Sequence, residues 1–320
     1  MFEVTSSRPA KTRRAIVLCC DDAYLPYAAM ALDRIAALSH DRDFDLCLCS
    51  SVSMLALPKS LAHLDIRSCH VDIGNAFDGL RLDPGRTADI YLRLGLPAAF
   101  SKDYDRILYL DSDIFVQRGD FGALLSVDLG GHAIGAIRDN TQWRTPGRRP
   151  EQFRRLGLPA APYFNAGVLL MDVAACNAGR ILDRCVKLGR ENAALMIRHD
   201  QNLYNAVLRG DWAELSPLWN WQYTWSSRLF ETMADANVVH FIGNRKPWGH
   251  VGGEFPLRFR RAYRAFNALH FPQNPVPADD GIHPIANEGF LRKMLLKHLF
   301  SHRRMARYLS RFPTDLTVVT

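Results

Sequence analysis

The sequence predicts an α/β fold in which helices flank a mostly parallel central sheet. Short apolar, β-prone runs alternate along most of the chain with longer segments whose apolar residues recur at helical spacing. This alternation of strand and helix is typical of parallel sheets. The 320 residues, 48% hydrophobic and 23% charged, have an ordinary globular composition and are enough for one large domain with an appendage.

The expected elements follow from these runs in order along the chain. Aliphatic runs bounded by polar residues predict strands over 15–20, 44–49, 66–71, 106–110, 132–137, 164–171 and 238–242. Helical spacing predicts helices over 27–38, 87–96 and 181–190, and a further helix opens at 199–201. Loops rich in Pro and Gly lie at 82–85, 145–150 and 271–277. We take the last loop as the boundary between a domain of residues 1–277 and a basic helical tail of residues 278–320.

The positive charge of the chain is concentrated in this tail. The formal net charge is +7, and residues 287–312 carry +6 of it through seven Lys or Arg against Glu288. The body is therefore close to neutral. A nucleic-acid-binding protein is expected to spread basic charge over its fold, so the pattern argues against nucleic acid as a partner.

The cysteines and the hydropathy favour a cytoplasmic protein. Seven cysteines are odd in number, contain no Cys-x-x-Cys pair and lie mostly inside apolar runs, which is typical of buried thiols in a reducing compartment. No apolar run reaches about 18 residues, the length that predicts a membrane span. The first residues lack the apolar core of a signal peptide.

The segment Arg106-Ile-Leu-Tyr-Leu-Asp111-Ser-Asp113 carries the clearest chemical signal. Alternate side chains of an extended backbone share a face, so Asp111 and Asp113 can converge on one bound object where the strand ends. Ligands of open α/β sheets bind at that edge. Two clustered carboxylates repel each other unless a cation lies between them, and hard divalent cations accept such ligands. The alternative is a turn or a helix cap.

Two further segments end strands with polar residues. The first strand is followed by Asp21-Asp22-Ala-Tyr24, in which a carboxylate and an aromatic ring suit a heterocyclic base, although both acids could instead cap the next helix. Residues 162–172 place Asn165 and Gly167 inside a strand, where a small residue allows a ligand to approach closely. A bulge in a buried strand is the alternative there.

Two more segments add possible ligands later in the chain. His199-Asp200-Gln201 opens a helix, where Asp200 could simply be the N-cap. The segment from Val238 to Trp248 contains a histidine that could be a third metal ligand, followed by Gly243 and Lys246, which could surround an anionic phosphate. A purely structural histidine is the alternative for His240.

Taken together and in this order, these segments resemble the retaining glycosyltransferases of family 8, close to bacterial lipooligosaccharide and lipopolysaccharide galactosyl- and glucosyltransferases. The resemblance rests on Asp-Asp-x-Tyr, Ile-Tyr-Leu-Arg93-Leu, Leu-Tyr-Leu-Asp111-Ser-Asp113, Tyr-Phe-Asn165-Ala-Gly-Val, Asp200-Gln201 and His240-Phe-Ile-Gly243-Asn-Arg-Lys246-Pro-Trp248. It covers residues 13–250. One departure is Ala23, where close relatives often carry Asn, so a contact to the nucleotide is expected to be missing.

The resemblance implies a GT-A fold that holds a UDP-sugar through a metal. It assigns Asp111, Asp113 and His240 to Mn²⁺ or Mg²⁺, and two oxygens with an imidazole suit manganese. It assigns Cys19, Asp21, Tyr24 and Ser112 to the nucleotide side of the donor and Gly243 and Lys246 to the pyrophosphate. Residues implied around the transferred sugar, and hence in catalysis, are Arg93, Asn165, Asp200 and Gln201. The expected donor is UDP-galactose or UDP-glucose, and the expected acceptor is a saccharide, free or linked to lipid, of the lipopolysaccharide or lipooligosaccharide core.

Two other functions share some of these features. A haloacid-dehalogenase-like phosphatase also uses Asp-x-Asp after an apolar strand, but usually earlier in the chain and followed by Thr or Val, whereas Ile114 follows here. A non-catalytic nucleotide-sugar binding protein is the second alternative, although the three metal-ligand positions are all present. The sequence does not distinguish the UDP-sugar, the acceptor linkage, the oligomeric state, or front-face attack from double displacement.

The tail also predicts a contact with membranes. At about 100° per residue, Met305, Tyr308, Leu309 and Phe312 share one side of a helix, and the arginines at 303, 304, 307 and 311 share the other. Such a helix suits the surface of an anionic bilayer, which would attach the protein peripherally to the inner face of the cytoplasmic membrane. The alternative is that the preceding stretch, Phe290 to Phe300, packs on the body as a helix and that the helix from Ser301 to Phe312 is merely a solvated basic face.

Overall fold

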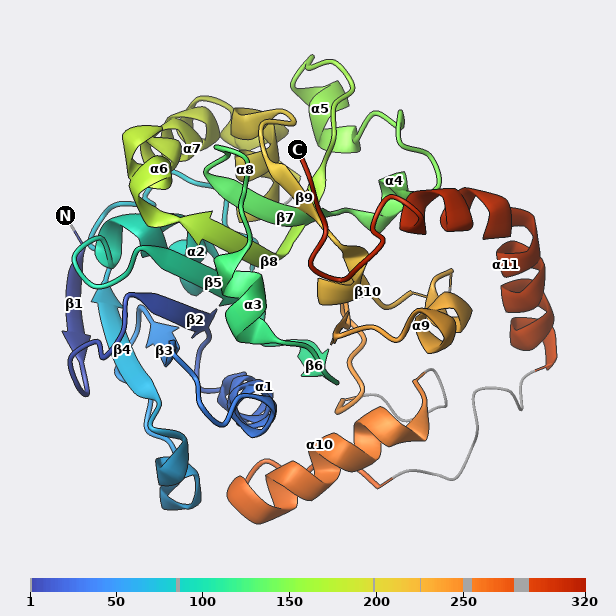
Figure 1. Cartoon of the computed structure of the whole chain (residues 1–320). Coiled ribbons are helices and arrows are strands. Elements are labelled where there is room, and N and C mark those ends of the chain that lie inside the picture. Colours follow the sequence, from blue (N-terminus) through green and yellow to red (C-terminus); the bar gives the residue numbers. More distant parts are fainter. Residues whose placement is uncertain (1, 85–86, 198, 225, 250–254, 279–287) are drawn as a thin grey trace.

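A nine-stranded sheet forms the centre of the molecule, with helices on both faces (Figure 1). The computed structural model describes residues 2–84, 87–197, 199–224, 226–249, 255–278 and 288–320. In spatial order the strands are β1 Glu3–Ser6, β4 Arg67–Asp72, β3 Asp45–Ser50, β2 Arg14–Cys19, β5 Arg106–Leu110, β8 Phe164–Asp172, β7 Ile134–Arg138, β9 Ala213–Leu215 and β12 Val318–Val319. Strands β1, β8 and β12 run against the other six, so the predicted mostly parallel sheet is confirmed.

A second, smaller sheet lies beside the first. It consists of β10 Trp221–Gln222, β11 Val238–His240 and β6 Ile114–Val116. Strand β6 follows the Asp-x-Asp segment directly, and β11 pairs with it antiparallel, His240 opposite Ile114. The Phe241 N–H donates to the Asp113 carbonyl at 3.0 Å. This pairing brings His240 next to Asp113, although 127 residues separate them in the chain.

Helices pack on the sheet because its strands are apolar on both faces. Ile16 and Leu18 of β2 face one core with helix α1 Leu25–Leu38, and Ala15 and Val17 face the other with helix α2 Asp89–Ala99. The remaining helices are α3 Phe121–Ser126, α4 Asn140–Trp143, α5 Glu151–Arg155, α6 Val173–Ala178, α7 Ile181–Glu191, α8 Asp200–Leu208, α9 Arg228–Ala234, α10 Leu257–His270 and α11 Glu288–Leu309. Short 3₁₀ helices are η1 Lys59–Leu64, η2 Ala193–Leu195 and η3 Pro217–Trp219. The helices expected over 27–38, 87–96 and 181–190 correspond to α1, α2 and α7 and differ from them only at their ends, whereas α3, α4, α5, α6, α9 and α10 were not expected.

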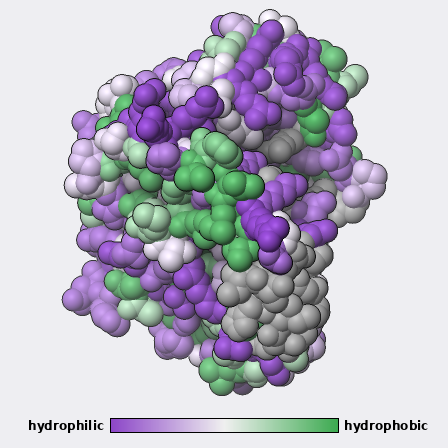
Figure 2. All heavy atoms as spheres, turned by 90° about the vertical axis from the view of Figure 1, so that its right-hand side faces the viewer, coloured by the Kyte–Doolittle hydropathy of each residue, from purple (hydrophilic) through white to green (hydrophobic). Residues whose placement is uncertain are grey.

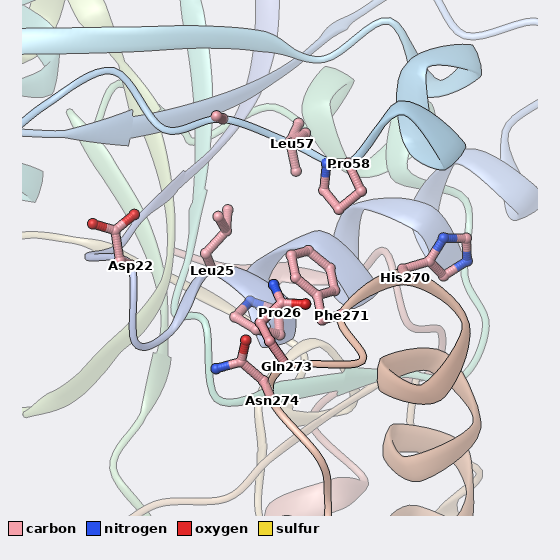
Figure 3. Close-up of a pocket in the computed structure, with 10 residues that line it drawn as sticks. Asp22, Leu25, Pro26, Leu57, Pro58, His270, Phe271, Gln273 and Asn274 are labelled. Atoms are coloured by element: carbon pink, nitrogen blue, oxygen red, sulfur yellow. The ribbon is translucent and has the colours of Figure 1, made fainter.

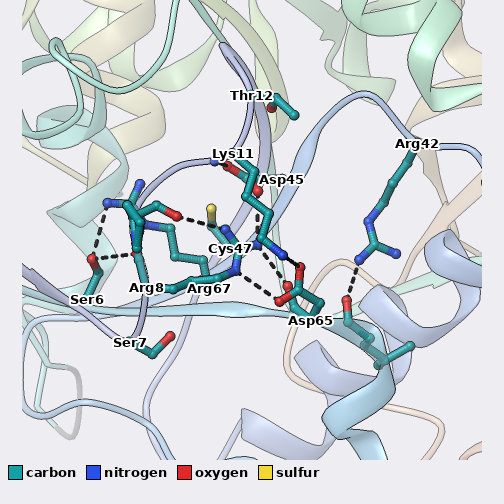
Figure 4. Close-up of polar contacts among 12 residues, drawn as sticks. Ser6, Ser7, Arg8, Lys11, Thr12, Arg42, Asp45, Cys47, Asp65 and Arg67 are labelled. Carbon is teal, nitrogen blue, oxygen red and sulfur yellow. Dashed lines mark hydrogen bonds and ion pairs between the residues drawn. The ribbon is translucent and has the colours of Figure 1, made fainter.

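A polar network fixes the edge of the sheet where β2 and β3 begin (Figure 4). Asp45 accepts hydrogen bonds from Arg8 at 2.9 Å and from the Tyr104 hydroxyl at 3.0 Å. Arg67 donates to that hydroxyl at 3.0 Å and pairs with Asp103. Each buried charge therefore has a partner, which is the usual requirement for a stable buried ion pair. This network lies at the strand starts, opposite the edge that carries the motifs.

The end of the basic segment packs on the body. Met305, Tyr308 and Phe312 are buried in the main core, and Tyr308 stacks on Trp143 with the ring centroids 5.7 Å apart. Glu214 is bound by Arg138 at 2.6 Å and by Arg311 at 2.8 Å, and β12 then pairs with β9. These apolar side chains were expected at a membrane surface, and that part of the prediction is wrong, because the core already covers them. The boundary at residue 277 remains a prediction.

The first part of α11 exposes apolar side chains instead. Leu295, Leu296, Leu299 and Phe300 are 48–83% exposed. Figure 2 shows hydrophobic side chains gathered on this face of the molecule and bordered by hydrophilic ones. None of the helices in the described residues combines the length and the hydropathy that a membrane span requires.

Candidate active site

The predicted site residues meet in one cavity of about 850 Å³ at the carboxyl ends of β2 and β5. Strand β2 ends at Cys19, and β5 ends at Leu110, so both deliver the residues that follow them to the same edge. The cavity is lined, among others, by Cys19, Asp21, Tyr24, Arg93, Asp111, Ser112, Asp113, Asn165, Asp200, Gln201, His240, Gly243 and Lys246. The structure therefore brings together every residue that the sequence places at the site.

Asp111, Asp113 and His240 form a group that fits a divalent cation. Their ligand atoms all lie within 4.8 Å of one another. His240 Nε2 is 3.0 Å from Asp113 Oδ1 and 3.5 Å from Asp111 Oδ2. Asp113 Oδ1 is buried without a hydrogen-bond partner. A buried carboxylate oxygen in that state is costly unless a cation approaches it, so the donor set fits the metal that the sequence predicts.

A chain of amide hydrogen bonds fixes the orientation of His240. Asn220 donates from Nδ2 to Asn165 Oδ1 at 2.9 Å, so its own Oδ1 is free to accept from His240 Nδ1 at 2.9 Å. With the proton on Nδ1, a neutral imidazole turns the lone pair of Nε2 toward the two carboxylates. Three electron-rich atoms then face one another, and a cation between them would remove the repulsion.

Gly167 makes room for this imidazole. Strand β8 contains an irregularity against β7, where the pairing passes from Ala136 with Leu169 to Ile137 with Asn165. The bulge that was the alternative interpretation is therefore present, and it lies in the site. A Cβ on Gly167 would be 2.2 Å from His240 Cε1 and 2.9 Å from Asp111 Oδ2. No larger residue fits there without moving a metal-ligand side chain.

Lys246 approaches the same carboxylate from the segment after β11. Its Nζ lies 2.5 Å from Asp113 Oδ2 and 2.5 Å from the Phe241 carbonyl. Burial raises the pKa of Asp113, but the charge and the hydrogen bond of Lys246 counteract it, and that pKa lies below its usual range. Gly243 provides the turn into this segment with φ +88, a conformation that favours glycine.

Arg93 connects the metal-ligand group with the sugar-side residues. Its guanidinium pairs with Asp111 at 2.8 Å and with Asp200 at 3.0 Å. Asp200 is the first residue of α8, and His199 rather than Asp200 is the N-cap. Burial raises the pKa of Asp200 to about 6, with Arg93 lowering it and the charge of Asp111 adding to the rise. The side chain thus combines a buried carboxylate with a fixed cationic partner.

Hydrogen bonds to both the oxygen and the nitrogen of its side-chain amide fix the position of Gln201. Oε1 accepts from Asn165 Nδ2 at 3.2 Å and from the Ala166 N–H at 3.4 Å, and Nε2 donates to Asp139 Oδ2 at 3.4 Å. Asp139 also caps the short helix α4 through Thr141. An amide held in this way can accept or donate hydrogen bonds at a fixed position in the cavity.

The two acids after β2 face different spaces. Asp21 and Tyr24 line the large cavity, and Asp21 Oδ1 accepts from the Tyr24 N–H at 3.0 Å. Asp22 instead lines a second hollow of about 570 Å³ between the start of α1 and the end of α10 (Figure 3). Helix α1 begins without a side-chain cap, with Pro26 in its first turn. Beside Asp21, Ser112 donates to the Cys19 carbonyl at 3.3 Å.

Tyr109 and Asn220 are among the residues at the site that the sequence did not identify. Tyr109 donates from its hydroxyl to Asp111 Oδ1 at 2.7 Å, and it shares a strand face with Asp111, so the alternation of β5 could have identified it. Asn220 lies between two tryptophans after η3 and has no pattern around it. Only the fold brings it to His240.

Several known proteins with similar sequences or structures are named as glycosyltransferases. The family model described as glycosyl transferase family 8 matches residues 15–252. Glycosyltransferase GlyF of Streptococcus pneumoniae is 29% identical over 248 residues, 74% of this chain and 57% of that protein. Lipopolysaccharide 1,3-galactosyltransferase of Salmonella typhimurium is 28% identical over 176 residues, 52% of this chain and 51% of that protein. The chain therefore spans between half and three fifths of the length of these curated relatives.

The solved structures give the fold. The galactosyltransferase LgtC, crystallised with donor and acceptor sugar analogs, superposes with a TM-score of 0.63 at 22% identity over 78% of this chain and 95% of that one. This likeness confirms the predicted GT-A type of fold. Because the family model covers well over half of the sequence, the chain belongs to glycosyl transferase family 8.

Proposed function

We propose that this member of family 8 transfers galactose or glucose from a UDP-sugar to a saccharide of the lipopolysaccharide or lipooligosaccharide core, with retention at the anomeric carbon. The proposal rests on one observation above all, the group of Asp111, Asp113 and His240 in the large cavity. The family membership argues against the phosphatase. The names of several relatives, among them a lipopolysaccharide galactosyltransferase and a lipopolysaccharide glucosyltransferase, support the choice of sugar and acceptor.

Asp111, Asp113 and His240 would hold Mn²⁺ or Mg²⁺. When bound, the cation would neutralise negative charge on the diphosphate of the donor. Asn220 keeps the imidazole of His240 in the tautomer that a metal requires. Asp21 and Tyr24 would bind the uracil through a carboxylate acceptor and a ring face. Lys246 would place its ammonium against the pyrophosphate, and Gly243 would allow the backbone to approach it.

The sugar side of the cavity would stabilise positive charge. Breaking the anomeric bond leaves negative charge on the diphosphate and an oxocarbenium-like sugar. Asp200 and the Gln201 amide oxygen are acceptors beside that sugar, and Arg93 and Asn165 hold them in position. An amide is a poor nucleophile, and the Gln201 oxygen already accepts two hydrogen bonds. We therefore favour front-face attack by the acceptor hydroxyl, whose proton passes to the departing phosphate.

A scan of UDP-sugars for metal-dependent hydrolysis tests this function. Purified protein is incubated with UDP-galactose, UDP-glucose, UDP-N-acetylglucosamine or UDP-glucuronate, with Mn²⁺ or with EDTA. We expect release of UDP from one of the first two, and loss of that release with EDTA. UDP-sugar binding without any turnover would favour a non-catalytic binding protein.

We also propose that the exposed face of α11 docks on an anionic membrane from the cytoplasm, where a lipid-linked acceptor would lie. Leu295, Leu296, Leu299 and Phe300 form an exposed apolar strip, and Arg292, Arg303 and Arg304 lie exposed on the same helix. Apolar side chains can enter the headgroup region, and each nearby cation adds about 1 kcal/mol. The proposed docking surface is therefore this strip and not residues 305–312, whose apolar side is buried.

Liposome sedimentation tests the docking surface. We expect the double variant Leu299→Ser with Phe300→Ser to lose binding to vesicles that contain phosphatidylglycerol, while UDP-sugar hydrolysis stays unchanged. Leu269→Ser is the matched control, because Leu269 is 72% exposed on α10, away from α11. Equal vesicle binding by the double variant and the wild type would contradict the proposal.

A further inference from the structure

A group of basic side chains lies beside the cavity and has no part in the functions described above. Arg144 directly follows α4, Arg228 is the first residue of α9, and Lys297 lies on α11. The Leu229 N–H donates to His298 Nε2 at 3.3 Å, which joins the start of α9 to the turn of α11 that carries Lys297. The charge of Arg144 also acts on Lys297. We call Arg144, Arg228 and Lys297 the basic cluster.

Arg144 is linked to the wall of the cavity through two hydroxyl groups. Its guanidinium donates to the Ser226 carbonyl at 2.7 Å and to Ser226 Oγ at 2.9 Å. Ser226 Oγ in turn lies 2.9 Å from Thr224 Oγ1, and Thr224 lines the large cavity. Both contacts of Arg144 are with neutral groups. Its positive charge is therefore not neutralised by the residues that position it.

Arg228 has buried donors without acceptors. Its Nε and Nη1 atoms are buried and make no hydrogen bond. Three rings surround the guanidinium instead, Tyr223 at 5.2 Å and Phe255 and Phe290 at 5.5 Å. Rings can stabilise the cation through their faces, but they do not accept the in-plane N–H groups. Burial lowers the pKa of Arg228 and of Arg144, because it disfavours the charged form of the guanidinium. A bound anion would stabilise that charge at both residues.

The acids around the cluster are already paired. Glu231, on the same helix as Arg228, binds Arg258 at 2.7 Å, and Glu214 binds Arg138 and Arg311. In the described part of the chain, neither Arg144 nor Arg228 forms an ion pair with a carboxylate. Arginines left in this way beside a substrate cavity are typical of phosphate sites, since the guanidinium fork matches phosphate oxygens.

We propose that the basic cluster binds a phosphate group carried by the acceptor saccharide. This inference rests on the proposed glycosyltransferase function. Lys246 and a cation held by the metal-ligand residues would provide positive charge for the donor diphosphate. Arg144 and Arg228 are instead joined to Thr224, a different lining residue of the cavity, through the Ser226 hydroxyl and the Arg228 N–H. A phosphorylated sugar could place its hydroxyl in the cavity and its phosphate on Arg144 and Arg228. The enzyme would then prefer phosphorylated acceptors over neutral ones of the same sugar.

Calorimetry on the full chain, with saturating UDP and Mn²⁺ to fill the donor site, tests this preference. The probes are glucose 6-phosphate and glucose. We expect the phosphate to bind at least about tenfold more tightly, the effect of one or two charge-assisted hydrogen bonds. Arg144→Gln and Arg228→Gln should each remove most of that preference, and Arg144→Lys should keep most of it. UDP affinity should stay the same in all three.

Arg264→Gln is the matched control, because Arg264 is exposed on α10 and has no place in the cluster. Its preference for the phosphate should equal that of the wild type. Equal affinity for glucose 6-phosphate and glucose would overturn the proposal, and so would a preference that survives in both glutamine variants. If those variants lose only their binding to phosphatidylglycerol vesicles, the cluster serves a lipid and the proposal is wrong. Absence of UDP binding would refute the proposed function itself, and this inference with it.

Discussion

Two groups of charged residues lie close to the central sheet, and they differ in whether each charged or polar atom has a partner within the chain. Around Glu214, every charge has a partner: Arg138 and Arg311 bind the carboxylate, and the Tyr308 hydroxyl donates to it at 3.2 Å. Around Asp113, one carboxylate oxygen has no hydrogen-bond donor, and the imidazole that faces it presents a lone pair. The first group holds the fold together, whereas the second requires something that the chain does not supply.

Replacing Asp113 should have the largest effect on activity and little effect on the fold. We expect Asp113→Asn to abolish metal-dependent transfer, because the neutral amide removes a ligand charge from the site of the diphosphate. Mn²⁺ should raise the Tm of the wild type and not that of the variant. Asp41→Asn is the control, because Asp41 is exposed and lies far from Asp113 in the sequence. Mn²⁺-dependent activity that survives in Asp113→Asn would contradict the metal assignment.

Replacing Glu214 should show the opposite behaviour. Glu214→Gln leaves the buried Arg138 and the partly exposed Arg311 without a counter-charge, which should lower the free energy of unfolding by about 3–5 kcal/mol. The UDP affinity of the folded fraction should not change. Chemical denaturation of both proteins at pH 7 measures the difference. A variant as stable as the wild type would show that this group does not anchor the C-terminal segment.

The same carboxylate gives a pH dependence with a definite sign. Burial raises the pKa of Glu214, but the hydrogen bonds and charges of Arg138 and Arg311 outweigh it, and the pKa lies below its usual value. The stabilisation is therefore fully present above the unfolded pKa of about 4.3 and is lost as the pH falls through the folded value. We expect the Tm difference between wild type and Glu214→Gln to shrink below about pH 4. A constant difference down to pH 3 would argue against this ion pair.

Lys246 should have a smaller effect than the metal ligands. Lys246→Ala removes one charge-assisted contact to the diphosphate, so we expect UDP affinity and transfer to fall together by about ten- to a hundredfold. Calorimetry with UDP and initial rates with the preferred UDP-sugar measure the two effects. Lys246→Arg should recover part of both. Unchanged UDP affinity in the alanine variant would show that Lys246 serves only Asp113.

Asn220 should have the smallest effect, because it acts only through His240. Asn220→Ala should weaken Mn²⁺ binding by about tenfold, the usual size for a residue that orients a metal ligand. Asn220→Asp keeps an acceptor for His240 Nδ1 and should recover most of the affinity. Titration of Mn²⁺ followed by electron paramagnetic resonance measures the change. Equal affinities in all three proteins would mean that packing alone orients the imidazole.

The sequence predicts the central sheet and the site well, and the peripheral strands poorly. Strand β5 and the acids after it were predicted with the right bounds, because a long apolar run and two carboxylates are a strong local signal. Strands β6, β9, β10 and β12 have two or three residues each, too few for a period to be recognised. Their positions depend on pairing between distant segments.

Two of the errors, the omission of Asn220 and the misjudged tail, have the same origin. Asn220 reaches His240 only because β10 and β11 pair, and the tail was misjudged because its apolar side packs on Trp143 of the distant helix α4. A helix with one apolar side predicts that this side is covered, but not by what. The motifs in the sequence therefore identified the residues that carry the chemistry of the site. The residues that hold them in position depend on contacts between distant segments, which the sequence does not reveal.

The edges of the large sheet have a consequence for solubility. A row of unpaired backbone groups on an edge strand is a template for association with other chains. Here β4 is covered by the four-residue strand β1, and β9 by the two-residue strand β12, both running antiparallel to their neighbours. Edge strands this short offer little length for further pairing. A protein without β12 would expose the backbone groups of Glu214 and Leu215 on that side. Such a shortened protein should aggregate during purification, although it still contains every residue of the active site.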